Sequence, residues 1–216
     1  MTVSAPWPKL RRNLVAILRG VTPDEIVGIG TEIFEAGIDA IEIPLNSPDP
    51  FVSIERLAKA LPAALVGAGT VLTPEDVARL SQAGGRLLVS PNVDADVLRS
   101  AAGFGMVTMP GVFTATEAFL ALRCGASALK FFPASVIGAN GIAALRAVLP
   151  KETVVGAVGG VSDTDFAAYA KAGVTAFGLG SSLYKPGMTV ADVSARAKAA
   201  VTAYDVVFAG ANGQRT

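Results

Sequence analysis

The chain has 216 residues, of which 51% are apolar, and this is enough to bury the core of one domain. Lys plus Arg and Asp plus Glu both number 18, so no net charge favours nucleic acid or an anionic membrane surface as a partner. Histidine is missing, which excludes His-ligated zinc, Ser-His-Asp triads and Cys-His pairs. Any proton carrier in an active site must therefore be a carboxylate, lysine, tyrosine, cysteine or water.

A single cysteine, Cys124, and an N-terminus without a basic-then-apolar segment predict a cytoplasmic protein without disulfides. The apolar stretches are broken by Gly, Pro or charged residues before they reach the ~18 residues that span a bilayer. We therefore expect a soluble protein with no membrane partner.

Short β-rich apolar runs alternate along the chain with longer amphipathic segments. Strands are expected at residues 14–18, 39–43, 64–68, 86–89, 105–109, 127–132, 153–158 and 175–179. Several of the helices expected between them begin with a small hydroxyl residue followed by Pro or an acid, as in Thr73-Pro74-Glu75-Asp76. Others end in Ala-Gly, as in Ala36-Gly37, which is typical of a helix C-terminus.

Eight strand-helix units predict a single-domain α/β protein, a closed (β/α)₈ TIM barrel, with an open doubly wound sheet as the alternative. The barrel is favoured because no single strand-helix junction dominates the pattern. Residues 1–13 are expected to be an N-terminal extension that covers the bottom of the barrel, and residues 14–207 the barrel itself. Residues 208–216 are expected to be a flexible tail.

Reacting groups in such a barrel stand at the C-terminal ends of the strands. Lys130 shares one face of its strand with Ala128 and Phe132, and the second strand carries Glu42 in the same way. If both faces point inward, Lys130 and Glu42 are the two ionisable groups inside the barrel mouth.

Lys130 stands in an apolar run, where burying an unpaired ammonium costs several kcal/mol. A dry site lowers the pKa of a lysine, and the free amine then attacks carbonyl groups to form a Schiff base. Glu42 is placed to move protons to and from the substrate. The alternative is a buried Lys–Glu ion pair that only fixes strand register.

Glycines follow the seventh and eighth predicted strands, at Gly159-Gly160 and Gly180-Ser181, where barrels often bind phosphate. Glycine lets backbone N–H groups approach an anion, although plain tight turns remain the alternative. Thr70 ends a turn that exposes donors suited to a carboxylate. Arg19 is either a bidentate carboxylate ligand or a solvated charge at a strand end.

Five motifs in order resemble the 2-keto-3-deoxy-6-phosphogluconate/phosphogalactonate aldolase family. They are Ala16-Ile17-Leu18-Arg19-Gly20, Ile41-Glu42-Ile43-Pro44-Leu45-Asn46-Ser47-Pro48, Gly67-Ala68-Gly69-Thr70-Val71-Leu72, Leu129-Lys130-Phe131-Phe132-Pro133 and Val158-Gly159-Gly160-Val161. The resemblance covers roughly residues 10 to 205. It implies a class I aldolase of barrel fold, commonly a homotrimer, which needs no metal or other cofactor.

The resemblance also implies a role for each matching residue. Lys130 would form the Schiff base and Glu42 would donate and accept protons. Arg19 and Thr70 would contact the keto-acid part of the substrate. The phosphate would be held by Gly160, Gly180 and Ser181, and Val158 and Gly159 would also contact the substrate.

Two departures favour the galactonate-type branch. Gluconate-type members read L-R-T after the catalytic glutamate and P-T-G-G at the seventh strand, whereas this chain has Leu45-Asn46-Ser47 and Ala157-Val158-Gly159-Gly160. The expected reaction is cleavage of 2-dehydro-3-deoxy-6-phospho-D-galactonate to pyruvate and D-glyceraldehyde 3-phosphate. The alternatives are the gluconate epimer as substrate, dual specificity, a phosphosugar isomerase, or a binding protein for phosphorylated sugar acids.

Overall fold

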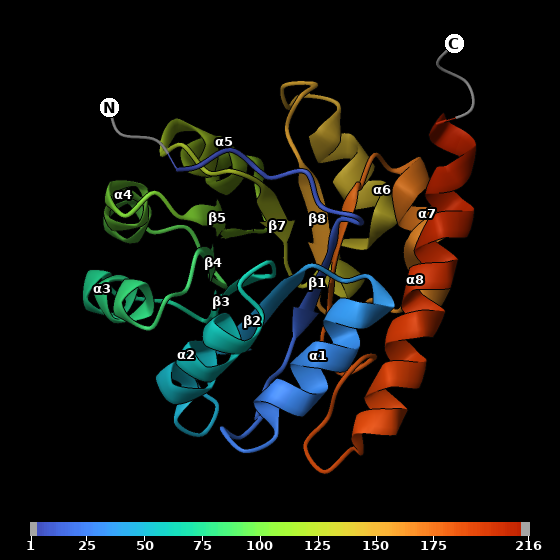
Figure 1. Cartoon of the computed structure of the whole chain (residues 1–216). Helices are drawn as coiled ribbons and strands as arrows, with labels where there is room; N and C mark the ends of the chain where they lie inside the picture. Colours follow the sequence, from blue (N-terminus) through green and yellow to red (C-terminus); the bar gives the residue numbers. More distant parts are fainter. Residues whose placement is uncertain (1–3, 213–216) are drawn as a thin grey trace.

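The computed structural model describes residues 4–212, and in this range parallel strands form a barrel surrounded by helices (Figure 1). The strands are β1 Leu14–Ile17, β2 Ala40–Pro44, β3 Leu65–Gly69, β4 Leu87–Val89, β5 Val107–Met109, β6 Gly111–Val112, β7 Leu129–Phe131, β8 Val155–Val158 and β9 Ala176–Leu179. The helices are α1 Ile26–Ala36, α2 Pro50–Ala60, α3 Pro74–Gln82, α4 Ala95–Gly103, α5 Ala115–Arg123, α6 Ala134–Arg146, α7 Phe166–Lys171 and α8 Val190–Asn212, with a short 3₁₀ helix at Asp163–Asp165.

The ring closes at Pro110, which directly follows the fifth predicted strand, residues 105–109, and separates β5 from β6. The sheet order is β5-β4-β3-β2-β1-β9-β8-β7-β6, so β5 pairs with β4 on one side and β6 pairs with β7 on the other. Proline has no N–H to give to a strand ladder, but its carbonyl still accepts from the Lys130 N–H at 3.0 Å. The predicted TIM barrel is therefore confirmed, and the doubly wound alternative is wrong because the two sheet ends meet.

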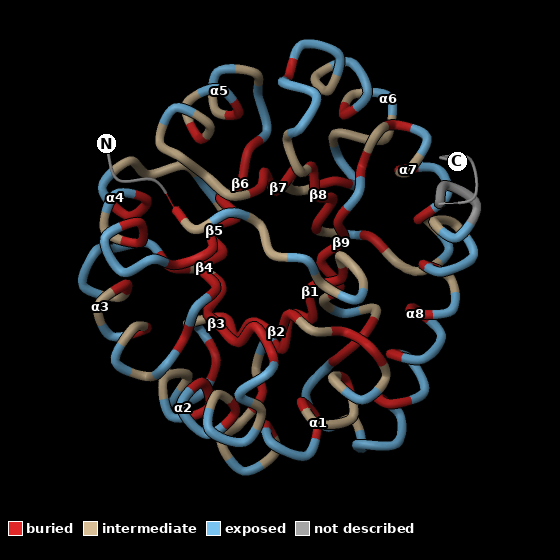
Figure 2. The backbone as a smooth tube through the Cα atoms, turned by 45° about the horizontal axis from the view of Figure 1, so that its top comes forward, coloured by how far each residue is buried: buried red, intermediate tan, exposed pale blue. Residues whose placement is uncertain are grey.

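Buried strands form a ring in Figure 2, with the exposed surface of the helices outside it. One core cluster lies between the strands and the helices, and a second fills the inside of the barrel. Ala40 and Ala128 belong to the inner cluster. Because side chains alternate along a strand, Glu42 and Lys130, each two residues further on, also face the interior.

Residues 4–13 cross the end of the barrel where the strands begin (Figure 2). The Ala5 N–H donates to the Met106 carbonyl at 3.0 Å, and Ser127 Oγ donates to the Ala5 carbonyl at 2.6 Å. The side chains of Trp7 and Leu10 pack against the inner core cluster. This segment therefore covers the barrel interior at the end opposite the predicted site.

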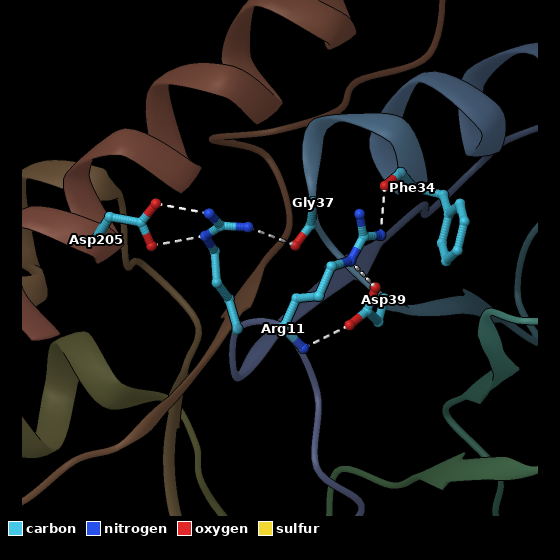
Figure 3. A network of polar contacts seen from close by, with 6 residues as sticks. Arg11, Phe34, Gly37, Asp39 and Asp205 are labelled. Atoms are coloured by element: carbon cyan, nitrogen blue, oxygen red, sulfur yellow. Dashed lines mark hydrogen bonds and ion pairs between the residues drawn. The ribbon is translucent and has the colours of Figure 1, made fainter. Parts of the chain in front are cut away.

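Two arginines hold the end of this segment against the barrel (Figure 3). Asp39, just before β2, accepts from the Arg11 backbone N–H and from Arg11 Nε, each at 2.6 Å. Arg12 donates to both carboxylate oxygens of Asp205 in α8, at 2.7 and 2.6 Å. These contacts tie the chain before β1 to the start of β2 and to helix α8.

Helix α8 is longer than the sequence predicts, because residues 208–212 continue the helix where a flexible tail is expected from residue 208. The rings of Phe208 and Tyr204 stack with centroids 4.4 Å apart, and Phe177 of β9 lies 6.3 Å from each ring. Burial of this aromatic cluster stabilises the last turns of the helix. Residues 213–216 of the predicted tail, like residues 1–3, lie outside the described residues.

The first and last helices, α1 and α8, lie side by side along the barrel (Figure 1). Ser194 Oγ of α8 donates to Glu32 Oε2 of α1 at 2.6 Å. Within residues 4–212, none of the helices combines the length and the apolar character needed to cross a membrane.

Replacing Asp39 with alanine is expected to lower the free energy of unfolding by about 1 to 3 kcal/mol, since it removes charged hydrogen bonds from a largely buried carboxylate. Asp24→Ala is the control, because the Asp24–Arg56 pair is exposed and its loss changes stability by at most about 0.5 kcal/mol. Urea unfolding measures both variants. Equal losses would show that the contact of Arg11 with Asp39 does not stabilise the fold.

Candidate active site

A cavity of about 400 Å³ opens at the end of the barrel where the strands finish. Every residue that the sequence predicts for the site lines it: Arg19, Glu42, Thr70, Lys130, Val158, Gly159, Gly160, Gly180 and Ser181. These residues come from β1, β2, β3, β7, β8 and β9 or from the loops that follow them. Because the parallel strands all end at the same side of the barrel, residues up to 162 positions apart in the chain, from Arg19 to Ser181, meet in one cavity.

Lys130 reaches the cavity from β7 and is only 7% exposed. Its Nζ lies 4.6 Å from the centroid of the Phe132 ring, which also lines the cavity. Burial lowers the pKa of Lys130, the nearby Arg19 charge acts in the same direction, and the Glu42 charge opposes both. The amine is therefore neutral over a wider pH range than an ordinary lysine.

Glu42 lies opposite this amine on β2 and is 2% exposed. Burial raises the pKa of Glu42 to about 7, although the charges of Lys130 and Arg19 oppose the rise. Its Oε2 atom is buried, and none of the protein groups in residues 4–212 donates a hydrogen bond to it. A carboxyl group with such a pKa takes up and releases protons near neutral pH.

Lys130 and Glu42 influence each other electrostatically but are not an ion pair. Among the described residues, the charged contacts within 4.0 Å involve other side chains. The alternative drawn from the sequence, a Lys–Glu pair that only fixes register, needs such a contact. In its absence, both groups remain available to a molecule in the cavity.

The segment that follows β2 forms hydrogen bonds with the loop after β1, which contributes Arg19 to the cavity wall. Asn46 Oδ1 accepts from Arg19 Nη1 in a short hydrogen bond, and Ser47 Oγ accepts from the Gly20 N–H at 2.9 Å. Asn46 and Ser47 are two of the positions at which the chain departs from the gluconate-type motif. They hold the loop after β1 and orient the Arg19 guanidinium.

Thr70 has a left-handed backbone conformation, with φ at +59°. Left-handed backbone angles are strained for a β-branched residue, and residues with strained angles cluster at functional sites. Thr70 follows the last residue of β3 directly and lines the cavity.

The glycines after β8 are required by both backbone and space. Gly159 and Gly160 have φ values of +91° and +72°. A Cβ on Gly160 would lie 2.6 Å from the side chain of Ser135, and one on Gly159 would lie 3.0 Å from the Phe132 ring. Both glycines line the cavity, so the backbone of this turn is available to an anion there.

Sequence reasoning missed a second part of the wall, formed by Tyr184, Lys185 and Pro186 in the loop between β9 and α8. The loop folds back toward β1, since a Cβ on Gly20 would lie 2.8 Å from Pro186 Cγ. Lys185 adds a cation to the cavity. These residues stand five to seven positions beyond the end of β9, so a search at strand ends does not reach them.

In the part of the chain that the structure describes, no group of three or more His, Cys, Asp or Glu side chains is arranged to hold a metal ion.

Known proteins resemble this chain over nearly its whole length. A family described as KDPG and KHG aldolase matches residues 9–195. A probable 2-dehydro-3-deoxy-6-phosphogalactonate aldolase of Rhizobium meliloti is 60% identical over 206 residues, which cover 95% of this chain and 97% of that protein. A 2-dehydro-3-deoxy-6-phosphogalactonate aldolase of Escherichia coli is 50% identical over 192 residues, with 88% and 94% coverage.

A solved structure described as native KDPGal superposes with a TM-score of 0.92 at 47% identity, and the match covers 94% of this chain and 99% of the other. The chain thus agrees with these aldolases in sequence and in fold, over most of its own length and of theirs. This chain belongs to the KDPG and KHG aldolase family.

Proposed function

We propose that the protein is a class I aldolase that cleaves 2-dehydro-3-deoxy-6-phospho-D-galactonate to pyruvate and D-glyceraldehyde 3-phosphate. The observation that carries the proposal is the buried, unpaired amine of Lys130 in the cavity, with its pKa lowered and Glu42 nearby. An amine in this state is the nucleophile that Schiff-base chemistry needs. The names of the two relatives supply the substrate.

The reaction starts with attack of the Lys130 amine on the C2 ketone, followed by loss of water to give an imine. The protonated imine accepts electrons, and Glu42 takes the proton from the C4 hydroxyl. The C3–C4 bond then breaks, which releases the aldehyde and leaves an enamine on Lys130. Glu42 returns a proton to C3, and water hydrolyses the resulting imine to pyruvate and the free amine.

The two anionic ends of the substrate have separate partners in the cavity. Arg19 and Thr70 bind the carboxylate, because a guanidinium and a hydroxyl both donate to carboxylate oxygens. Backbone donors after β8 and β9, at Gly159, Gly160 and Gly180, bind the phosphate with Ser181. The cation of Lys185 adds to the attraction for this end.

Val158 favours the galactonate epimer, because its side chain presents methyl groups where gluconate-type members have a threonine hydroxyl. A hydroxyl placed to bond one C4 configuration discriminates strongly between epimers, and an apolar side chain removes that bond. The gluconate epimer, as a slower substrate, is the second candidate.

The protein works as a homotrimer in the cytoplasm, without a metal or another cofactor. The iminium on Lys130 is the electron sink of the reaction, so no step as written needs a metal. Light scattering coupled to gel filtration tests the assembly.

Lys130→Met is expected to abolish turnover without unfolding the protein, since methionine fills a similar apolar volume but cannot attack a ketone. Incubation of the native protein with pyruvate and borohydride should add one reduced pyruvate to the peptide that contains Lys130. Mass spectrometry locates the adduct. Labelling of another lysine would refute Lys130 as the nucleophile. The absence of an adduct on this peptide would favour an isomerase, and ligand-induced thermal stabilisation without aldehyde formation would favour a binding protein.

The cleavage rate is expected to fall about tenfold per pH unit below about pH 7, where Glu42 becomes protonated and can no longer accept the C4 proton. The sign follows from the raised pKa, since an ordinary glutamate would keep its charge down to about pH 4.5. A profile of kcat/KM against pH measures this fall, because kcat/KM reports the pKa values of the free enzyme. Glu42→Gln should lose both the pH dependence and most of the activity. A rate that stays level down to pH 5 would exclude Glu42 as the base.

A coupled assay with both C4 epimers should give a kcat/KM at least about tenfold higher for the galactonate epimer. Val158→Thr is expected to reduce this ratio, because it restores a hydroxyl beside C4. Val161→Thr is the matched control, since Val161 lines the same cavity and should leave the ratio unchanged. Preference of the native protein for the gluconate epimer would reverse the substrate assignment and leave the mechanism intact.

A further inference from the structure

The carboxylate of Glu42 lies directly beside Gly69 on the neighbouring strand β3. The register pairs the Cα of Glu42 with that of Gly67 and the Cα of Pro44 with that of Gly69, so the glutamate side chain extends forward along β3. A Cβ on Gly69 would lie 2.0 Å from Oε2 and 2.5 Å from both Cδ and Oε1 of Glu42. Real Cβ atoms essentially never approach other atoms closer than 3.0 Å. The carboxylate therefore occupies the volume that any side chain at position 69 would take.

Backbone conformation does not explain a glycine at this position. Gly69 is the last residue of β3 and is not among the glycines with positive φ. Its carbonyl accepts from the Leu45 N–H at 2.8 Å, as in an ordinary strand ladder. Gly69 is also not among the described residues that line the cavity. The remaining reason for glycine is the space that it leaves for the glutamate.

Within residues 4–212, no protein group donates a hydrogen bond to the buried Oε2 atom of Glu42. Its position depends on packing against the wall of the barrel. We propose that Gly69 is a positioning residue, which provides the space where the Glu42 carboxylate rests apart from the Lys130 amine. The inference rests on the proposed function, in which Glu42 carries protons and Lys130 must be free to attack.

A methyl group at position 69 would displace the carboxylate toward the cavity, where the positive charges of Lys130 and Arg19 attract it. An ion pair with Lys130 would keep the amine protonated and unable to attack the ketone. The carboxylate would also leave the place from which it reaches the C4 hydroxyl. Both changes affect the chemical steps, whereas the residues that contact the two ends of the substrate stay in place.

Gly69→Ala is therefore expected to lower kcat about 100-fold and to change KM less than threefold. The acid limb of kcat/KM should move to lower pH, because the displaced carboxyl is better solvated and nearer to two cations. Gly103→Ala is the control, since a Cβ there meets nothing within 4 Å and the native rate should be kept. A Gly69→Ala rate within threefold of the native rate, or a large fall in kcat with an unmoved acid limb, would overturn the inference.

A thermal-stability cycle with Glu42→Ala tests the contact independently of activity, and it decides the case even if Gly69→Ala alone fails to fold. Gly69→Ala should lower Tm when Glu42 is present and leave it nearly unchanged when position 42 is alanine. An equal loss in both backgrounds would place the clash elsewhere and overturn the inference. A native protein that cleaves neither C4 epimer would instead refute the proposed function.

Discussion

The structure depends on keeping a buried amine and a buried carboxylate close to each other without letting them pair. Lys130 and Glu42 are 7% and 2% exposed. Burial is the main cause that lowers the pKa of Lys130 and raises the pKa of Glu42. Burial without pairing costs folding free energy, because neither group recovers the water that it loses. A direct ion pair would recover part of that cost, but it would also keep the nucleophile protonated. The separation of the two groups is thus a functional arrangement that the rest of the barrel must stabilise.

The barrel supplies this stabilisation at positions away from the site. The inner cluster fills the interior below the two charged groups, and residues 4–13 cover its open end. Aromatic side chains of β9 and α8 join the end of the chain to the same body. Ile17 and Val158 of the inner cluster also line the cavity and contribute to the burial that lowers the pKa of Lys130. The contacts of residues 4–13 and of the aromatic cluster lie away from the cavity, so they stabilise the fold without acting on the titration of Lys130.

Much of this arrangement follows from local patterns in the sequence. The alternation of apolar runs and capped helices predicts the barrel, and a two-residue period correctly places Glu42 and Lys130 inside it. The extra strand β6 after Pro110 was not predicted, because its pairing with β7 is known only once the ring closes. The helical end of α8 was missed because Phe208 is stabilised by Tyr204 and Phe177, and only the folded chain brings Phe177 of β9 to this helix.

In the site, too, some residues can be predicted from the local sequence pattern, and others only from the folded structure. Residues at strand ends are predicted by their place in the repeat, whereas Tyr184 and Lys185 enter the cavity through a loop whose path depends on packing over Gly20. The role of Gly69 is even harder to predict, since in the sequence it is only one residue of a glycine-rich turn. Its neighbour Gly67 is glycine because a Cβ would lie 1.8 Å from the Leu87 carbonyl oxygen, a contact between strands. Gly69 instead leaves room for a buried carboxyl group that must exchange protons without pairing with Lys130, and that requirement joins the backbone of β3 to the chemistry of the cavity.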